Sequence, residues 1–346
     1  MSRTDEARDP TTSDRQLLRV AELYYEHDMT QEQIAKQLTL TRWKVGRMLR
    51  SARDRGIVRI EIVHPKARVR ELEARLMTRF GLQQAFVVPA SGDVDHQRRE
   101  VALVAADALS DLRPEPRVVG VSWGRTMDDV SRAVAPGWAR GVEVVQVNGA
   151  VTHGRHAGGA AVATELARQG RGSARLLAAP AIVEKAATRL AIEADTSVQQ
   201  VLQAARDADV LLFSLGSLSV GSVLVDSGYV TAKDVARLRA MGAVGDVLGR
   251  FIDADGAEVS EDLAARTVAL QLEEIRRVPI SIAVASGAEK AWVARAALLS
   301  GLCTVLVADS DVVSGILALD DETSLDPEAA TITRTNRIHS YTGDSS

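Results

Sequence analysis

The chain has 346 residues, a formal net charge of −4, 46% hydrophobic residues and a single cysteine, Cys303. This length predicts two or three domains, and one cysteine excludes an internal disulfide bond. The polar start "MSRTDEARDPTTSDRQ" is unlike a signal peptide, and no apolar run approaches the roughly 18 residues of a membrane span. We therefore expect a cytoplasmic protein without a membrane partner.

Basic charge is concentrated near the start of the chain. Residues 1–13 are expected to be a disordered tail. Residues 14–64 carry ten Lys/Arg and seven Asp/Glu, whereas the whole chain has 42 and 46. A small basic unit joined to a larger acidic one predicts a polyanionic partner for the first unit only.

Three helical patterns follow one another in residues 14–64. The first helix, "SDRQLLRVAELYYEHDM", has an apolar stripe and a cap at Ser13 or Asp14. The second begins at Thr30, with Gln33 completing a capping box. The third runs from Thr41 to a terminating Gly56, and "IVRIEIVH" (57–64) reads as a short strand or wing. This order predicts a winged helix-turn-helix domain.

The third helix has an inward stripe and a basic outward face. Its inward stripe consists of Val45, Met48, Leu49 and Ala52. In a helix-turn-helix, residues at the start of the recognition helix meet base edges in the major groove. The residues that we expect to contact double-stranded operator DNA are Thr41, Arg42, Trp43, Lys44, Arg47 and Arg50. A solvated basic face is the alternative interpretation.

Two residues of this helix leave a question open. Trp43 is a large outward aromatic residue that either packs on a sugar or a thymine methyl group or covers its own domain. Gly46 is unusual within a helix and could permit a close approach to DNA.

Residues 66–80, "KARVRELEARLMTRF", predict a further helix with Val69, Leu72, Leu76 and Phe80 on one face. The stripe is too short to identify a coiled coil. The helix therefore either packs on its own domain or also pairs subunits.

From residue 85 onward, β-branched runs alternate with Ala-rich helical stretches. The expected strands are 85–89, 117–122, 142–149, 175–179, 209–216, 280–286 and 304–309. The expected helices lie near 95–111, from 125, and near 157–169, 183–206, 231–241, 260–277 and 288–300. Apolar strands between helices indicate a parallel sheet covered on both faces, a doubly wound α/β fold. This domain is expected over 65–321, with a mobile tail over 322–346.

Seven separated segments support a family resemblance. They are "TQEQIAKQLTLTRWKVGRMLRSARDRGIVRIEI" (30–62), "LEARLMTRFGL" (72–82), "VGVSWGRTM" (119–127), "VVQVNGA" (144–150), "LLFSLGSL" (211–218), "GAVGDVLGRFIDADG" (242–256) and "SGAEKAWVARAALLSGLCTVLVAD" (286–309). In this order they resemble the SorC family of sugar-responsive transcription regulators, the deoxyribonucleoside-regulator-like group. The resemblance implies an effector and oligomerisation domain like sugar-phosphate isomerases and CoA transferases that has lost catalysis, and a homo-oligomer, usually a tetramer.

Two glycine loops predict an anion site in the second domain. "VVGVSWGRTM" reads as strand, loop and helix start, where backbone N–H groups can bind an anion. "SGAEKAW" repeats this arrangement with a lysine that an anion would favour at a helix start. The residues assigned to a phosphate are Ser122, Gly124, Arg125, Thr126, Gly287 and Lys290. Taken alone, the first loop is weak evidence for a phosphate, and a tight turn that packs its helix on the sheet is the alternative.

Polar residues near other strand ends are candidates for binding sugar hydroxyl groups: Gln146, Asn148, Asp246, Arg250 and Asp253. Residues 152–159 are expected to form one wall of the same pocket. His153 and His156 have no cysteine or carboxylate cluster beside them, so we expect neither a metal nor a cofactor. Cys303 is expected in the core.

Two functions fit these features. The first is a DNA-binding regulator of carbohydrate catabolism genes, whose operator affinity is controlled by a phosphorylated sugar or polyol. The second is a phosphosugar isomerase-like or CoA-transferase-like enzyme with an accessory helix-turn-helix. An isomerase needs a positioned general base, and only Asp246 is a candidate, without an evident acid partner. We favour the regulator and expect no enzymatic activity.

Overall fold

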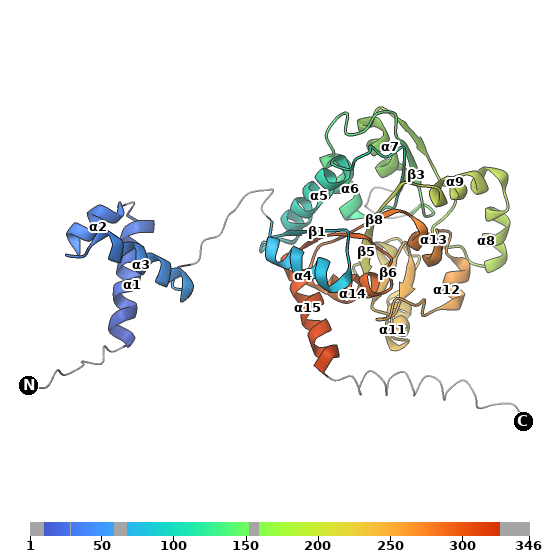
Figure 1. Ribbon diagram of the computed structural model, residues 1–346. Coiled ribbons are helices and arrows are strands. Elements are labelled where there is room, and N and C mark those ends of the chain that lie inside the picture. Colours follow the sequence, from blue (N-terminus) through green and yellow to red (C-terminus); the bar gives the residue numbers. More distant parts are fainter. Residues whose placement is uncertain (1–9, 28, 59–67, 152–158, 326–346) are drawn as a thin grey trace, which may run out of the picture. The chain divides into compact units, whose positions relative to one another are not determined.

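A computed structural model describes residues 10–27, 29–58, 68–151 and 159–325 (Figure 1). Contacts divide the chain into two units, Met1–His64 and Pro65–Ser346. Within the described ranges, no helix combines the length and apolar character needed to cross a lipid bilayer.

The first unit contains helices α1 (Pro10–Tyr25), α2 (Gln31–Gln37) and α3 (Arg42–Asp54). They enclose a small core that includes Val20, Leu23, Ile34, Val45 and Leu49. The predicted capping box is confirmed, because Thr30 Oγ1 accepts a hydrogen bond from Gln33 N at 3.3 Å and Gln33 Oε1 accepts one from Thr30 N at 2.8 Å.

Both ends of this unit differ from the expectation. Helix α1 begins at Pro10, so residues 10–13, expected in a disordered tail, are helical. Proline is favoured at the first helical position because its missing N–H would have no partner there. At the other end, Ile57 and Val58 form no strand and pack near Leu17 and Ala52. The rest of the expected wing lies outside the described residues.

The second unit is built on seven parallel strands in the order β1-β9-β8-β5-β2-β3-β4. The strands are β1 (Gln84–Val88), β2 (Val118–Val121), β3 (Glu143–Gln146), β4 (Ser173–Arg175), β5 (Val210–Ser217), β8 (Ile280–Ala285) and β9 (Val305–Asp309). From β2 the chain moves outward through β3 to β4, then returns to place β5 on the other side of β2. The doubly wound α/β fold is confirmed, and its strand order reverses between β2 and β5.

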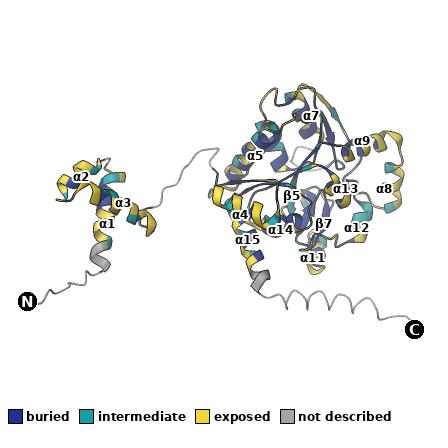
Figure 2. Cartoon of the chain, in the orientation of Figure 1, coloured by how far each residue is buried: buried dark blue, intermediate teal, exposed yellow. Residues whose placement is uncertain are grey.

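Each face of the sheet supports its own core. The strands between the two cores are buried (Figure 2). Side chains alternate along β5, with Leu211 and Phe213 in one cluster and Val210 and Leu212 in the other. The helices on the second face are α5 (Val94–Ser110), α6 (Arg125–Ala133) and α7 (Gly159–Gln169). Those on the first are α4 (Arg70–Phe80), α9 (Thr196–Arg206), α13 (Leu272–Arg277), α14 (Ala291–Leu299) and α15 (Ser310–Leu325).

A third cluster, which includes Trp123, Leu224, Leu238 and Phe251, lies beyond the strand ends. The remaining elements are α8 (Ala186–Glu193), α10 (Val223–Asp226), α11 (Ala232–Ala240), α12 (Glu261–Arg266), the 3₁₀ turn η1 (Ala288–Lys290) and the hairpin β6 (Gly245–Val247) and β7 (Arg250–Ile252). Strand β6 pairs antiparallel with β5, so the hairpin extends the end of a central strand.

Several expected elements need correction. The helix expected over 183–206 is two helices, because Asp195 caps α9 by accepting a hydrogen bond from Ser197 N at 2.8 Å. The helix expected over 260–277 is interrupted by residues 267–270, which bridge to other segments. Strand β4 precedes the expected 175–179 run. Helix α15 was not predicted and continues to Leu325, into the expected tail. Residues 326–346 lie outside the described ranges.

Helix α4 packs on its own unit, an arrangement that is compatible with both of its alternatives. Leu76 is buried, and Val69, Leu72 and Phe80 are partly buried against the same core. A role of α4 in pairing subunits stays a prediction.

Candidate functional site

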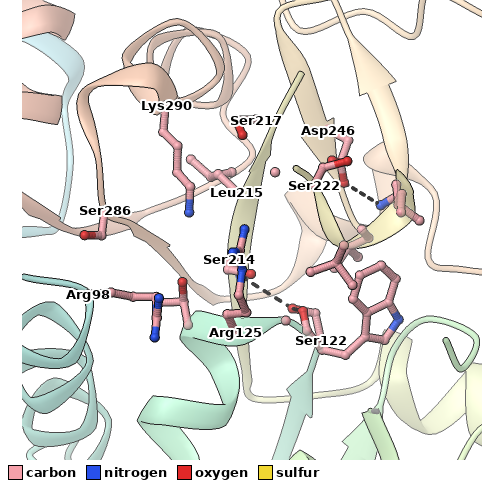
Figure 3. A pocket seen from close by; sticks show the side chains of 18 of the residues that line it. Arg98, Ser122, Arg125, Ser214, Leu215, Ser217, Ser222, Asp246, Ser286 and Lys290 are labelled. Atoms are coloured by element: carbon pink, nitrogen blue, oxygen red, sulfur yellow. Dashed lines mark hydrogen bonds between the residues drawn. The ribbon is translucent and has the colours of Figure 1, made fainter. Parts of the chain in front are cut away.

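A cavity of about 150 Å³ lies at the carboxyl ends of β2, β5 and β8 (Figure 3). By the same measure one water molecule needs about 10–15 Å³, so a small organic molecule fits. In open α/β sheets, ligands bind beyond the strand ends where the strand order reverses. Strands β2 and β5 are that point here.

The loop after β2 forms one wall of the cavity. Gly124 has φ 137°, and a Cβ there would lie 3.0 Å from Ser214 Oγ, so glycine suits both the backbone and the close approach of β5. Ser122 and Thr126 are almost fully buried beside it. Trp123 Nε1 donates a hydrogen bond to Gly149 O at 2.7 Å, which fixes the loop against the segment after β3.

Two cations extend into the same part of the cavity (Figure 3). Arg125 begins α6, and its Nη2 donates a hydrogen bond to Gly221 O at 3.1 Å. Lys290 ends η1 and is half-buried. Burial, together with the positive charge of Arg125, lowers the pKa of Lys290 against the opposing influence of Glu289. Neither cation forms an ion pair with a carboxylate of the described residues, so an anion between them would be stabilised.

Asp246 lies on the hairpin that faces this cation pair. Its side chain is 8% exposed, and its Oδ2 accepts a hydrogen bond from Gly249 N at 3.0 Å. It packs over β5 so closely that a Cβ on Gly216 would be 1.9 Å from Asp246 Oδ1. Burial raises the pKa of Asp246 to about 6, although Gly249 N–H and Lys290 act in the opposite direction. This carboxylate is therefore held in place and incompletely solvated.

Asn148 supplies an unpartnered acceptor to the same cavity. Its side chain is 2% exposed, and its Oδ1 has no hydrogen-bond partner among the described residues. Buried polar atoms are nearly always hydrogen-bonded, because an unpaired one costs its full desolvation energy. A donor from a bound molecule, such as a hydroxyl group, would satisfy this oxygen.

Other lining residues were missed by the sequence analysis. The polar ones include four serines and one arginine: Ser214, Ser217, Ser222, Ser286, and Arg98 from α5. Arg98 is already paired with Asp95 at 2.5 Å and with Asp129 at 2.7 Å. Ser214 and Ser217 lie in the carboxyl half of β5, and Ser286 directly follows β8. The rule that ligands bind at the carboxyl ends of strands would have identified these three.

Four residues predicted to bind the effector do not line this cavity. Gln146 instead donates its Nε2 hydrogen to Asn148 O at 2.7 Å and supports that segment. Arg250 is fully buried and donates to Leu270 O, Ala269 O and Glu258. Asp253 Oδ1 accepts hydrogen bonds from two backbone N–H groups of its own turn, at 3.0 Å each.

Gly287 is the fourth residue outside the cavity lining. Its N–H donates to Asp309 Oδ2 at 2.8 Å and is therefore occupied, contrary to the expectation that it would face an anion. The chain at Lys290 is also a 3₁₀ turn rather than the first turn of an α-helix. From this second loop, the cavity receives Ser286, Glu289 and Lys290.

Metal ligands and a reactive thiol were also considered in the described part of the chain. No cluster of His, Cys, Asp and Glu suited to a metal ion occurs there. His153, His156 and the expected wall over 152–158 lie outside the described residues. Cys303 is buried, and burial raises the pKa of its thiol to about 12, as for a core residue.

The first unit presents a basic face along α3. Val45, Leu49 and Ala52 are buried as predicted, and Met48 is partly buried. The expected DNA contacts Arg42, Trp43, Lys44, Arg47 and Arg50 are all exposed. Thr41 caps the helix, since its Oγ1 accepts a hydrogen bond from Lys44 N at 3.2 Å. The arrangement offers several cations to a polyanion.

The chain is similar to sugar-binding regulators along most of its length. The family described as "Putative sugar-binding domain" matches residues 64–318. The deoxyribonucleoside regulator of Bacillus subtilis (strain 168) is 31% identical over 297 residues, 84% of this chain and 94% of that protein. The transcriptional regulator LsrR of Enterobacter sp. (strain 638) is 29% identical over 312 residues, 89% of this chain and 94% of that protein.

The fold similarity extends to a solved full-length structure. The crystal structure of the sorbitol operon regulator SorC from Klebsiella pneumoniae is 25% identical, with a TM-score of 0.66. The match covers 90% of this chain and 99% of that one, a larger share than the second unit alone.

Proposed function

Because this chain belongs to the SorC-like family of sugar-binding transcriptional regulators, we propose that its cavity binds a phosphorylated sugar or polyol, which controls the affinity of α3 for operator DNA. The observation that carries the proposal is the convergence of Arg125 and Lys290, without an ion-pair partner among the described residues, opposite buried acceptors.

The phosphate lies at the Arg125 and Lys290 end of the cavity. A doubly charged phosphate offsets the repulsion between these two cations and returns the pKa of Lys290 toward its ordinary value. The α6 N-terminus adds backbone N–H groups and the buried Thr126 hydroxyl. Serine hydroxyls from β5 and β8 surround this end with further donors.

The carbohydrate portion lies toward Asp246 and Asn148. Asp246, already fixed by Gly249 N–H, accepts a hydrogen bond from a ligand hydroxyl, and Asn148 Oδ1 accepts a second. Both groups are buried, so a ligand that lacks these hydroxyl groups would leave them unpaired. Polyol and sugar phosphates share the required pattern of one anionic end and several hydroxyl groups.

Operator DNA binds along α3. Arg42 and Arg47 lie in the first half of the helix, where recognition helices contact base edges, and Arg50 lies further along toward the phosphate backbone. Two half-sites require paired copies of this helix, so we propose a homo-oligomer, a tetramer, that acts in the cytoplasm. The effector controls DNA affinity by binding one arrangement of the oligomer more tightly than the other.

The experiment combines three measurements on the full chain. A thermal-shift screen with phosphorylated sugars and polyols identifies a ligand, because a molecule that binds only the native state raises its stability. Operator affinity is then measured with and without that ligand, and the ligand is assayed for conversion. A change in DNA affinity without turnover supports the regulator. Turnover would favour the isomerase-like or CoA-transferase-like alternative, with Asp246 as its base.

Variants test ligand binding by the second unit and operator binding by the first unit separately. Lys290→Met and Thr126→Val should remove the ligand response and retain operator binding, whereas Arg47→Ala should weaken operator binding and retain the ligand-induced thermal shift. Arg140→Ala is a suitable control, because this exposed arginine of the second unit is absent from the cavity lining. A normal ligand response in both cavity variants would place the anion site elsewhere.

A further inference from the structure

Trp43 is the most exposed tryptophan in the described part of the chain, at 70%. It lies on α3, whose buried stripe of Val45, Leu49 and Ala52 already holds the helix to its unit. An indole ring with this exposure contributes little to the core, so its presence needs another explanation.

The ring lies against a cation of the basic face. The guanidinium carbon of Arg47 lies 4.7 Å from the centroid of the Trp43 ring. Cations within about 6 Å of a tryptophan face are attracted by its quadrupole, and the spacing of four residues makes the two side chains neighbours on a helix. No ion pair within residues 29–58 involves Arg47. The indole ring is therefore what orients this guanidinium.

Gly46 flanks the same pair on the helix surface. A Cβ at this position would lie 3.3 Å from Gln31 Oε1, the end of a side chain on α2. Glycine leaves the Trp43–Arg47 pair without a side chain from position 46 beside it.

We propose that Trp43 is a positioning residue for Arg47, and that the pair together reads one guanine in the major groove. The indole face restricts the guanidinium to one plane, from which two N–H groups address guanine O6 and N7. Holding the side chain before binding reduces the rotamer entropy lost in the complex. The inference rests on the proposed binding of operator DNA by α3.

This arrangement makes a different prediction from direct contact of Trp43 with DNA. If the ring acts through Arg47, its removal lowers discrimination at the guanine that Arg47 reads and nowhere else. If the ring packs on a sugar or a thymine methyl, its removal costs affinity whether or not Arg47 is present. A double-mutant cycle separates the two, because coupled residues are not additive.

The test uses the full chain and an operator selected with it from a random double-stranded DNA library. Each guanine in the selected site is replaced in turn by 7-deazaguanine, which lacks the N7 acceptor. Affinities are measured for the parent chain, Trp43→Ala, Trp43→Phe, Trp43→Leu, Arg47→Ala and the double variant. Trp292→Ala, a half-exposed tryptophan of the second unit, serves as the control.

The expected result has three parts. Arg47→Ala abolishes the 7-deazaguanine effect at one position. Trp43→Ala weakens binding about two- to fivefold, the range for an exposed cation–π pair, and adds no loss in the Arg47→Ala background. Trp43→Phe keeps more of the affinity than Trp43→Leu, because phenylalanine retains a ring face and leucine only an apolar side chain.

Other results overturn the inference in distinguishable ways. Losses that multiply in the double variant would assign Trp43 a contact of its own. Equal affinities of Trp43→Phe and Trp43→Leu would remove the role of the ring face. An Arg47→Ala variant with parental affinity would refute the role of Arg47 and with it this inference. Failure to select any DNA sequence would refute the proposed operator binding. Because Trp43 is exposed, these variants are expected to fold, and helical circular dichroism checks this.

Discussion

Replacing Asp246 by asparagine should change how the stability of the second unit depends on pH. In the folded chain the pKa of Asp246 is raised from 3.8 to about 6, chiefly by burial. The native carboxyl group therefore retains its proton at higher pH than the unfolded one. Between these two values the native state binds more protons, so this group becomes less destabilising as pH falls.

The size of this stability change follows from the pKa shift of Asp246. At pH 7 both states are ionised, and the charged carboxylate costs the native state about 3 kcal/mol at 1.36 kcal/mol per pKa unit. At pH 5 the native group is mostly protonated, and the cost falls to roughly half of that value. Asparagine carries no charge, so it has no such cost. The stability difference between Asp246→Asn and the parent should therefore shrink by about 1 kcal/mol from pH 7 to pH 5.

Urea unfolding at several pH values measures this difference. In a Trp43→Phe background, the remaining tryptophans, Trp123, Trp138 and Trp292, all lie in the second unit and report on it alone. Glu115→Gln, an exposed carboxylate of the same unit, is the control for a general charge effect. Parallel stability curves for Asp246→Asn and its parent between pH 5 and 8 would refute the reasoning.

Three further outcomes are expected. Asn148→Ala should weaken binding of the screened phosphorylated ligand by about tenfold or more, because it removes a buried acceptor. Inorganic phosphate should bind equally to the variant and the parent in a competition assay. Equal losses of affinity for the ligand and for inorganic phosphate would contradict separate phosphate and sugar ends of the cavity. Gly216→Ala should remove ligand binding and lower the melting temperature, since its Cβ would lie 1.9 Å from Asp246 Oδ1; a parental thermal shift would show that the hairpin adjusts. Operator affinity should fall steeply between 50 and 200 mM salt, because phosphate contacts release counterions; a flat titration would exclude the basic face of α3.

Local signals predicted the first unit well. The capping box of Thr30 and Gln33 and the inward stripe of α3 depend on neighbours three and four residues apart, which a sequence shows directly. The start of α1 was missed because the polar run before Ser13 has no apolar period, although Pro10 marks a helix start.

In the second unit, the strands were predicted better than the segments that connect them. Buried parallel strands such as β5, β8 and β9 are continuous apolar runs that are recognisable without the fold. The short strand β6 pairs with β5, about 30 residues away, and β7 pairs with β6, so the hairpin depends on a distant partner that no local pattern shows.

In the candidate site, too, residues in local patterns were predicted and residues with distant partners were not. Ser122, Gly124, Arg125 and Thr126 follow a strand directly and were identified from that loop. Arg250 and Asp253 were assigned to the ligand because they are polar and close in sequence to Asp246. In the folded chain Arg250 donates to the distant carbonyl groups of Leu270 and Ala269, which no local pattern predicts. Asp253 accepts from N–H groups of its own turn, a common role of aspartate in loops. Burial alone does not separate a ligand contact from a structural hydrogen bond.

The β6–β7 hairpin allows ligand preference to change independently of the parallel sheet. It joins the sheet through one antiparallel contact with β5, and its two-residue turn, Leu248 and Gly249, has positive φ at both positions. Yet it brings Asp246, Leu248 and Gly249 to the cavity. Arg250 anchors the hairpin through Leu270 O and Ala269 O, so substitutions at Asp246 or Leu248 that keep Arg250 change the cavity without altering the seven parallel strands. Ligand preference among such regulators can therefore change through a few residues of this hairpin while the architecture stays constant.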